Sequence, residues 1–224
     1  MIKRYINDSI YSVDNFFKED RWLYKIKIND YQLVTIFWNL FLIIIPFVLG
    51  LLLYKFWERT GLRSFAHKAV ALLIWFVWLL FIPNTAYVMS EIRHLINYCP
   101  VNSPFQVCEK NAWMILFFFC YSIIGWVSFV YLLNQMKKLL SEIMGNLISY
   151  LFIILIIPLI ALGFLLGLIN RWNSWEFFIY TEKFIDNTLV YFNDPSHFTN
   201  LLIFTIFLYI LYFAGNFLFK RRNY

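Results

Sequence analysis

The chain has 224 residues, of which 62% are hydrophobic, 22% aromatic and only 14% charged, and its mean hydropathy is +0.66. Soluble domains carry about 45–50% apolar and about 25% charged residues, so this chain lacks the polar side chains that cover a water-soluble globule. The net charge of +6 does not indicate nucleic-acid binding, because the basic residues stand at the ends of apolar runs and form no polar patch. Composition therefore predicts an integral membrane protein with no nucleic-acid partner.

Residues 1–30 are predicted to form an amphipathic segment that does not cross the membrane. Apolar residues recur every three or four positions from Ile2 to Phe17, with charged residues between them. This pattern is typical of a helix that lies on a membrane surface or packs on a bundle. A signal peptide is not expected, because the apolar residues are dispersed and no small-residue cleavage site follows. We expect a single transmembrane helical domain over residues 31–224.

Five apolar runs have the roughly 20-residue length that crosses a hydrocarbon core about 30 Å thick. They are Leu33–Tyr54, Ala69–Met89, Ala112–Asn134, Leu147–Asn170 and Leu201–Phe219. Each run is nearly free of charge, and the short alternating segments of a β-barrel are absent from the sequence. The predicted fold is therefore all-α, a polytopic transmembrane helical bundle of five spans with amphipathic interfacial helices. Gly163 and Gly167 form a GxxxG pattern in the fourth span, which predicts close helix packing.

The distribution of Lys and Arg predicts the orientation, since cytoplasmic loops are enriched in both. Nine of them lie in residues 55–68, 135–146 and 220–222, whereas four lie in residues 90–111 and 171–200. This asymmetry predicts a plasma-membrane protein with a cytoplasmic C-terminus and an outer N-terminus, although six basic residues in the N-terminal segment favour the reverse. In either orientation, residues 90–111 and 171–200 face the same compartment.

The second span ends in an unusual polar sequence. Pro83 lacks an N–H and is expected to kink or restart the helix. Beyond it, Asn84, Tyr87, Glu91 and His94 are spaced three, four and three residues apart, so they share one face if the helix continues. Polar and ionisable groups near a membrane boundary are costly to bury and indicate a functional site. The simpler interpretation is that they are hydrated residues at the end of a span.

The fourth span runs into the string Arg171-Trp172-Asn173-Ser174-Trp175-Glu176. An arginine binds phosphate or carboxylate through two parallel hydrogen bonds, and the neighbouring amide and hydroxyl would add further ones. The two Trp residues also fit an interfacial anchor, which is the structural alternative. Residues 175–192 are too apolar for a free loop and too charged to span, so we expect an interfacial or re-entrant helix there, placed to cover the site.

Two carboxylate–histidine pairs lie in segments that face the same side, Glu91 with His94 and Asp194 with His197. Pairs at this spacing build carboxylate-bridged metal centres in helical bundles, and the two histidines together would suit a single zinc ion. The bridging glutamates of such centres are missing, and Asp194 precedes Pro195, which disfavours helical geometry at that point. We therefore predict no metal and no other cofactor.

The three cysteines leave two alternatives. Cys99 and Cys108 share one loop on the proposed outer side, and Cys120 lies inside the third span. A disulfide between the first two is chemically permitted in an oxidising compartment, and two free thiols fit equally well. The sequence contains no phosphate-binding glycine loop, no HExxH and no GxSxG, so it indicates none of these common enzyme classes.

Three stretches of the chain form specific strings. They are Trp38-Asn39-Leu40-Phe41 through Pro46, Phe81 through Tyr87 followed by His94, and Gly167 followed by Arg171 through Trp175. Through them, residues 35–180 resemble the uncharacterised bacterial integral membrane proteins grouped as domain of unknown function 1361. The resemblance implies a multi-span helical protein of a bacterial envelope and supplies no substrate.

The chain departs from the pattern of this family at three positions. Glu91 and Glu176 stand where the family tends to have Asp, and Leu168 stands where it tends to have Arg. If the family's Arg belongs to a binding site, anion binding in this chain depends on Arg171 alone.

Two functions fit these residues. The first is an envelope enzyme or binder that acts on a lipid or lipid-linked anionic substrate. Its residues would be His94, positioned by Glu91, for acid–base chemistry, and Asn84, Tyr87, Arg171, Asn173 and Ser174 for binding the substrate and a developing oxyanion.

The second function is a non-enzymatic accessory or scaffold subunit with a membrane-protein partner. In it, Arg171 would pair with Glu91 within the chain and the Trp residues would anchor the bundle in the bilayer. Small-solute transport is disfavoured, because no span has an ionisable residue at its centre.

Overall fold

The computed structural model describes residues 26–28, 31–92 and 112–219. Two-residue strands, β1 (Lys27–Ile28) and β2 (Tyr31–Gln32), pair antiparallel directly before the first long helix. The helices are α3 (Leu33–Thr60), α4 (Phe65–Phe81), α5 (Pro83–Met89), α6 (Trp113–Met144), α7 (Asn146–Ile169), the short 3-10 helix η3 (Glu176–Phe178), α8 (Thr181–Asn193) and α9 (Pro195–Phe219). The predicted all-α fold is confirmed. Of the predicted N-terminal segment, only residues 26–28 are described.

Five stretches of described helix are long and apolar enough to cross a membrane. They are Leu33–Thr60, Phe65–Ile92, Trp113–Met144, Asn146–Ile169 and Pro195–Phe219. Each predicted span coincides with one of them. The structure differs after the third span, because α6 continues through residues 135–144, where we expected a turn. Met136 and Leu139 are buried there, so the helix keeps an apolar face against the bundle until the chain reverses at Gly145.

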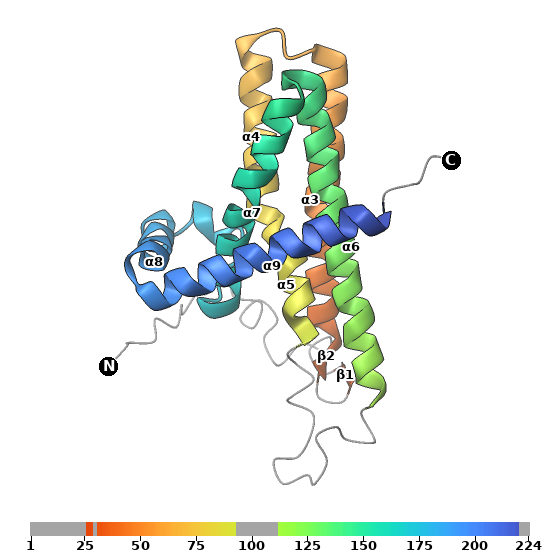
Figure 1. Cartoon of the computed structure of the whole chain (residues 1–224), viewed down its shortest axis with the longest axis vertical. Coiled ribbons are helices and arrows are strands. Elements are labelled where there is room, and N and C mark those ends of the chain that lie inside the picture. Colours follow the sequence, from red (N-terminus) through yellow and green to blue (C-terminus); the bar gives the residue numbers. More distant parts are fainter. Residues whose placement is uncertain (1–25, 29–30, 93–111, 220–224) are drawn as a thin grey trace.

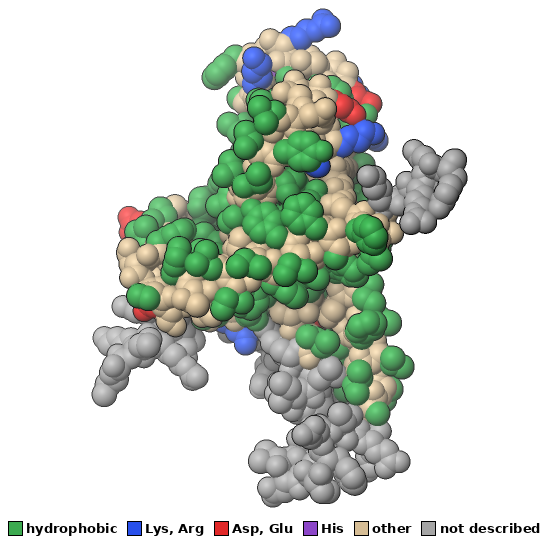
Figure 2. Space-filling model, viewed as in Figure 1, with side chains coloured by type: hydrophobic (Ala, Val, Ile, Leu, Met, Phe, Trp, Pro, Cys, Tyr) green, Lys and Arg blue, Asp and Glu red, His purple; other side chains and the backbone are tan. Residues whose placement is uncertain are grey.

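The outer surface of the bundle is apolar, as contact with lipid requires. Large side chains that are more than half exposed include Phe41 on α3, Leu72 on α4, Leu155 on α7 and Phe213 on α9. Figure 2 shows hydrophobic side chains over most of the visible face, with Lys and Arg gathered mainly at one end. Soluble proteins rarely expose apolar patches of this extent. The structure and the composition therefore agree on a multi-pass membrane protein.

Figure 1 shows α3, α4, α6 and α7 running roughly along the molecule, with α9 lying across α6 and α7 and in contact with both. The indole N–H of Trp126 on α6 donates to the Leu211 carbonyl on α9 at 2.9 Å. The Asn134 amide donates to Asn216 at 2.6 Å and accepts from the Tyr212 hydroxyl at 3.0 Å. Polar groups in an apolar surrounding need partners, so these bonds hold α9 against α6.

The short helix α5 packs between α6 and α7, and its backbone approaches both closely. A Cβ atom added to Gly125 of α6 would lie 2.7 Å from the Thr85 carbonyl oxygen. A Cβ atom added to Gly163 of α7 would lie 2.7 Å from Cγ of Pro83. No side chain fits at either distance, so glycine is what lets these helices touch. Gly163 therefore serves close packing as predicted, with α5 of the same chain as its partner.

We expect Gly163→Ala to destabilise the protein by roughly 1–3 kcal/mol, because the added methyl group overlaps Pro83 and pushes α5 away from α7. Thermal unfolding of the purified protein in detergent, followed by circular dichroism, measures the effect. The control is Leu155→Ala, which trims a side chain on the exposed face of the same helix and should shift the midpoint little. Equal midpoints for Gly163→Ala and the wild type would contradict the described packing of α5.

Candidate functional site

The candidate site is built on the break between α4 and α5. Pro83 is the first residue of α5, where its missing N–H leaves no helical partner unsatisfied. The N–H of Ile82 still donates to the Trp78 carbonyl at 3.0 Å, so the second span restarts at Pro83 without leaving the bundle. Beyond α5, residues 90–92 form one 3-10 turn. The helical path that was predicted to place Asn84, Tyr87 and Glu91 on one face therefore extends through residue 92.

Asn84 joins α5 to the segment that follows α7. Its side-chain amide donates to the Phe81 carbonyl at 2.8 Å and to the Ser174 hydroxyl at 3.0 Å, and both Asn84 and Ser174 are half-buried. Tyr87 lies beside the end of α7, since a Cβ atom added to Gly167 would lie 3.7 Å from its ring and 3.5 Å from the Trp172 carbonyl oxygen. The structure thus brings together the two polar motifs that stood out in the sequence.

The end of α7 turns sharply and leaves Arg171 exposed. Arg171 has a φ angle of +60°, in the left-handed region that side-chain-bearing residues rarely adopt. The N–H groups of Asn170 and Trp172 both donate to the Leu166 carbonyl and close the helix end around the turn. Within the described parts of the chain, the Arg171 guanidinium makes no hydrogen bond or ion pair, and the pairing with Glu91 expected of a scaffold subunit is not formed.

The segment after Arg171 is folded by its own polar groups. The N–H of Asn173 donates to the Glu176 carboxylate at 2.8 Å, and the N–H of Glu176 donates to the Asn173 carbonyl at 3.0 Å. Glu176 is 0% exposed, and its Oε1 has no hydrogen-bond partner among the described residues. The buried indole N–H of Trp172 also lacks one within that part of the chain. Buried polar atoms normally have partners, so each of these two atoms could accommodate one further polar partner.

Glu91 lies deeper in the bundle than Asn84. It is 1% exposed, and its carboxyl group and the Tyr87 side chain lie near the Tyr121 hydroxyl of α6. Tyr121 also interacts with the buried Asn39 side chain of α3, and its hydroxyl donates to the Ile36 carbonyl at 3.4 Å. Residues from α3, α6 and the end of the second span therefore form one buried polar cluster.

Trp175 connects the site to α3. Its ring meets that of Trp38 edge to face, with 5.8 Å between the ring centroids. Trp38 and Asn39 belong to the first of the three strings that carry the family resemblance, so all three strings meet in space. Sequence reasoning gave Trp38, Asn39 and Tyr121 no role in the site. A polar Asn inside an apolar span was a usable signal for Asn39, whereas nothing in the sequence distinguished Tyr121.

Some predicted features lie outside the described residues. His94 is one of them, so its pairing with Glu91 as an acid–base couple stays a prediction. Cys99 and Cys108 are also outside, and both alternatives for them stand. Cys120 is described, and it is an exposed free thiol in α6.

Asp194 serves the start of α9. Its carboxylate accepts the N–H groups of Ser196 at 2.8 Å and of His197 at 3.2 Å, and the His197 N–H is the main reason that the pKa of Asp194 lies below its ordinary value. This is the N-cap arrangement that Pro195 at the first helical position favours. In the described ranges, no group of three or more His, Cys, Asp or Glu side chains is placed to hold a metal ion.

Helix α8 packs beside the Arg171 turn. Phe184 contacts the rings of Trp172 and Phe177 edge to face, at centroid distances of 5.6 and 5.3 Å. The Tyr191 hydroxyl donates to Asn170 at 2.9 Å, and burial raises the pKa of Tyr191 to about 12, so it remains a donor at neutral pH. A helix was expected in this stretch, and the structure has η3 followed by α8. That this helical stretch covers the site stays a prediction.

The Asn84–Ser174 hydrogen bond predicts energetic coupling between the two side chains. We expect Asn84→Ala and Ser174→Ala each to lower the free energy of unfolding by about 1 kcal/mol, and the double variant to lose less than their sum by roughly 0.5–1.5 kcal/mol. Unfolding of the purified variants in detergent measures the cycle. Thr188→Ala is the control partner, because the Thr188 hydroxyl bonds only within α8 and its loss should add to that of Asn84→Ala. Simple additivity of the Asn84 and Ser174 variants would contradict the bond.

Comparison with known proteins bears on the resemblance seen in the sequence. No curated protein and no solved structure matches the chain. A family described as protein of unknown function (DUF1361) matches residues 38–212, most of the chain. The matched region runs from Trp38 on α3 to α9 and includes both motifs of the candidate site. The chain therefore belongs to the DUF1361 family.

Proposed function

We propose that this membrane protein binds the anionic group of a lipid or lipid-linked envelope substrate, and acts on it, where α5 meets the segment 171–176. The observation that carries the proposal is the Asn84–Ser174 hydrogen bond, which holds two polar motifs together beside Arg171. The guanidinium of Arg171 is exposed and has no ion-pair partner in the described part of the chain. Such an arginine suits bidentate hydrogen bonding to a phosphate or carboxylate.

The backbone of Arg171 supports the same proposal. A left-handed conformation costs a residue with a side chain roughly 1–2 kcal/mol, which glycine would avoid. Strain of this kind persists mainly where the side chain has a task. The turn at the end of α7 would be easier to form with glycine, so the arginine is better explained by what its guanidinium binds.

The other residues have distinct proposed roles. Asn173 and Ser174 would add hydrogen bonds to the anionic group, and Asn84 and Tyr87 would orient it or stabilise negative charge that develops during reaction. His94, positioned by Glu91, is the proposed general acid or base, since imidazole titrates near neutrality. Asn84 and Tyr87 belong to a stretch long and apolar enough to span a membrane, and Arg171 follows another. A site at these residues would lie near lipid headgroups, which supports a lipid-linked substrate.

We also propose a bacterial cell membrane as the location, with the C-terminus in the cytoplasm and the site on the outer side. The support is the excess of Lys and Arg in residues 55–68, 135–146 and 220–222. In a background with the three cysteines replaced by serine, a membrane-impermeant maleimide should label Lys183→Cys in intact cells. Arg63→Cys should react only after permeabilisation. The opposite pattern would invert the proposed orientation.

The enzymatic proposal predicts a change in the envelope lipids of cells that lack the protein. We expect a lipid or lipid-linked precursor to accumulate in the deletion strain and to disappear on complementation with the wild type. It should persist with His94→Ala, which removes the acid–base group, and with Arg171→Gly, which removes the guanidinium and relieves the backbone strain. Mass spectrometry of extracted lipids measures the species, and quantitative blotting confirms that each variant is present in the membrane.

Arg63→Gln is the matched control, because it removes an exposed arginine at the other end of the bundle and should restore the wild-type profile. Restoration by well-expressed Arg171→Gly would contradict the anion-binding role. An unchanged profile in the deletion strain would favour the alternative, a non-enzymatic accessory subunit. The observation in favour of that alternative is that Asn84 and Ser174 satisfy each other, as residues of a purely structural junction do.

A further inference from the structure

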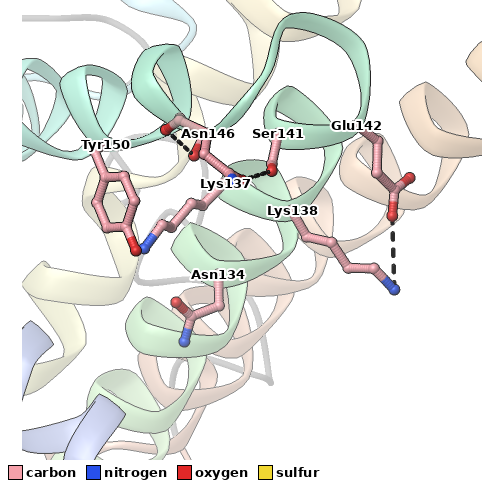
Figure 3. A pocket seen from close by; sticks show the side chains of 8 residues that line it. Asn134, Lys137, Lys138, Ser141, Glu142, Asn146 and Tyr150 are labelled. Atoms are coloured by element: carbon pink, nitrogen blue, oxygen red, sulfur yellow. Dashed lines mark hydrogen bonds and ion pairs between the residues drawn. The ribbon is translucent and has the colours of Figure 1, made fainter.

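A second polar region lies where α6 turns into α7. A pocket of about 320 Å³ is lined there by Lys137, Lys138, Ser141 and Glu142 of α6 and by Asn146, Ser149 and Tyr150 of α7 (Figure 3). The 24 residues of α7 separate this pocket from the Arg171 turn, a distance of about 36 Å along the helix axis. The two sites therefore lie at opposite ends of one membrane-spanning helix.

The two lysines of the pocket are available to an anion. The Lys137 ammonium lies 3.9 Å from the centre of the Tyr150 ring, and it makes no ion pair with a described residue. Such cation–π contact orients the ammonium while leaving its charge unneutralised. Lys138 pairs with Glu142 at 3.9 Å, but its side chain is 73% exposed, and pairs so exposed contribute little. A better-placed anion can therefore compete for Lys138.

The lining of the pocket is held in place by contacts on both sides. Ser141 and Asn146 hydrogen-bond across the turn, and Gly145 between them has a φ angle of +90°, which permits a reversal one residue long. Asn134 also lines the pocket, and its amide is fixed by Asn216 and Tyr212 of α9. Helix α7 begins here without a side-chain cap, so its first N–H groups add partial positive charge.

The whole end of the bundle is electropositive. Figure 1 shows the α3–α4 turn and the α6–α7 turn at this end, and Figure 2 shows Lys and Arg side chains over it. Its described charges are six basic and two acidic residues: Lys55, Arg59, Arg63, Lys68, Lys137 and Lys138 against Glu58 and Glu142. Basic pockets between transmembrane helices at a membrane surface bind anionic lipid headgroups.

We propose that the pocket binds the phosphodiester headgroup of one anionic phospholipid. Lysine ammonium groups and side-chain amide N–H groups are donors that a phosphate takes, and Lys137, Lys138 and Asn146 supply both kinds in the lining. Free phosphate would use the same donors, but the surface next to the pocket favours a lipid. Leu147 and Leu151 of α7 are 74% and 47% exposed and lie along the path that acyl chains would follow from this end into the bilayer. The site is separate from the one proposed at Arg171 and does not depend on its function.

Native mass spectrometry of the purified full chain in detergent tests the proposal, with phosphatidylglycerol and phosphatidylcholine added in turn. The wild type should retain one phosphatidylglycerol at concentrations that leave phosphatidylcholine unbound. The double variant Lys137→Gln/Lys138→Gln should bind phosphatidylglycerol at least about tenfold more weakly. Tyr150→Leu keeps every charge but releases Lys137 from the ring, and it should weaken binding by about two- to fivefold. Thermal unfolding confirms that each variant is folded.

The matched control is Arg59→Gln/Arg63→Gln, which removes two charges from the α3–α4 end of the same surface and should change retention by no more than about twofold. Equal weakening by both double variants would overturn the proposal, because it would show that the lipid is attracted by the basic surface as a whole and not bound in this pocket. Equal retention of phosphatidylcholine would overturn it as well. Complete displacement of the lipid by millimolar inorganic phosphate would show a free-anion site and overturn the lipid assignment.

Discussion

In the second membrane-spanning stretch, Pro83 has no N–H to donate to the preceding turn, so an unbroken helix would leave a backbone carbonyl without its usual partner in apolar surroundings. The chain begins a new helix at Pro83, and the Phe81 carbonyl just before the break accepts the Asn84 side-chain amide at 2.8 Å. The same amide also donates to Ser174, so one side chain connects the break in the second span to the segment that follows α7. Because Gly125 and Gly163 admit α5 between α6 and α7, the position of the candidate site depends on this break.

The spans were predictable because they depend on length and hydropathy alone. The same reasoning failed at residues 135–146, since lysines after an apolar run suggest the end of a helix. Met136 and Leu139 remain buried there and extend α6 for several more turns. Charged residues indicate where a helix is expected to leave the hydrocarbon, and the helix itself can continue beyond that point. For the same reason the reversal is shorter than the sequence suggested, and Gly145 alone accomplishes it.

The candidate site was predictable in its parts and not in its assembly. Spacing along one helix predicted that Asn84 and Tyr87 could act together, because helical geometry is local. The bond from Asn84 to Ser174 joins residues far apart in the chain, and it depends on how closely α5 and α7 pack. Glu176 illustrates the same limit, because nothing in its local sequence predicts that its carboxylate is fully buried and accepts the Asn173 N–H.

The connection between α6 and α7 is one residue long, which bears on how the protein enters its membrane. A single residue gives α7 little freedom to reach the bilayer independently, so we expect α6 and α7 to insert as one helical hairpin. Carrying Lys137 and Lys138 at the tip through the hydrocarbon would cost about 2.5–3.5 kcal/mol for each charge. In the orientation proposed above, the tip stays on the side where the chain is synthesised, and the two lysines would favour insertion of this pair of helices in that direction.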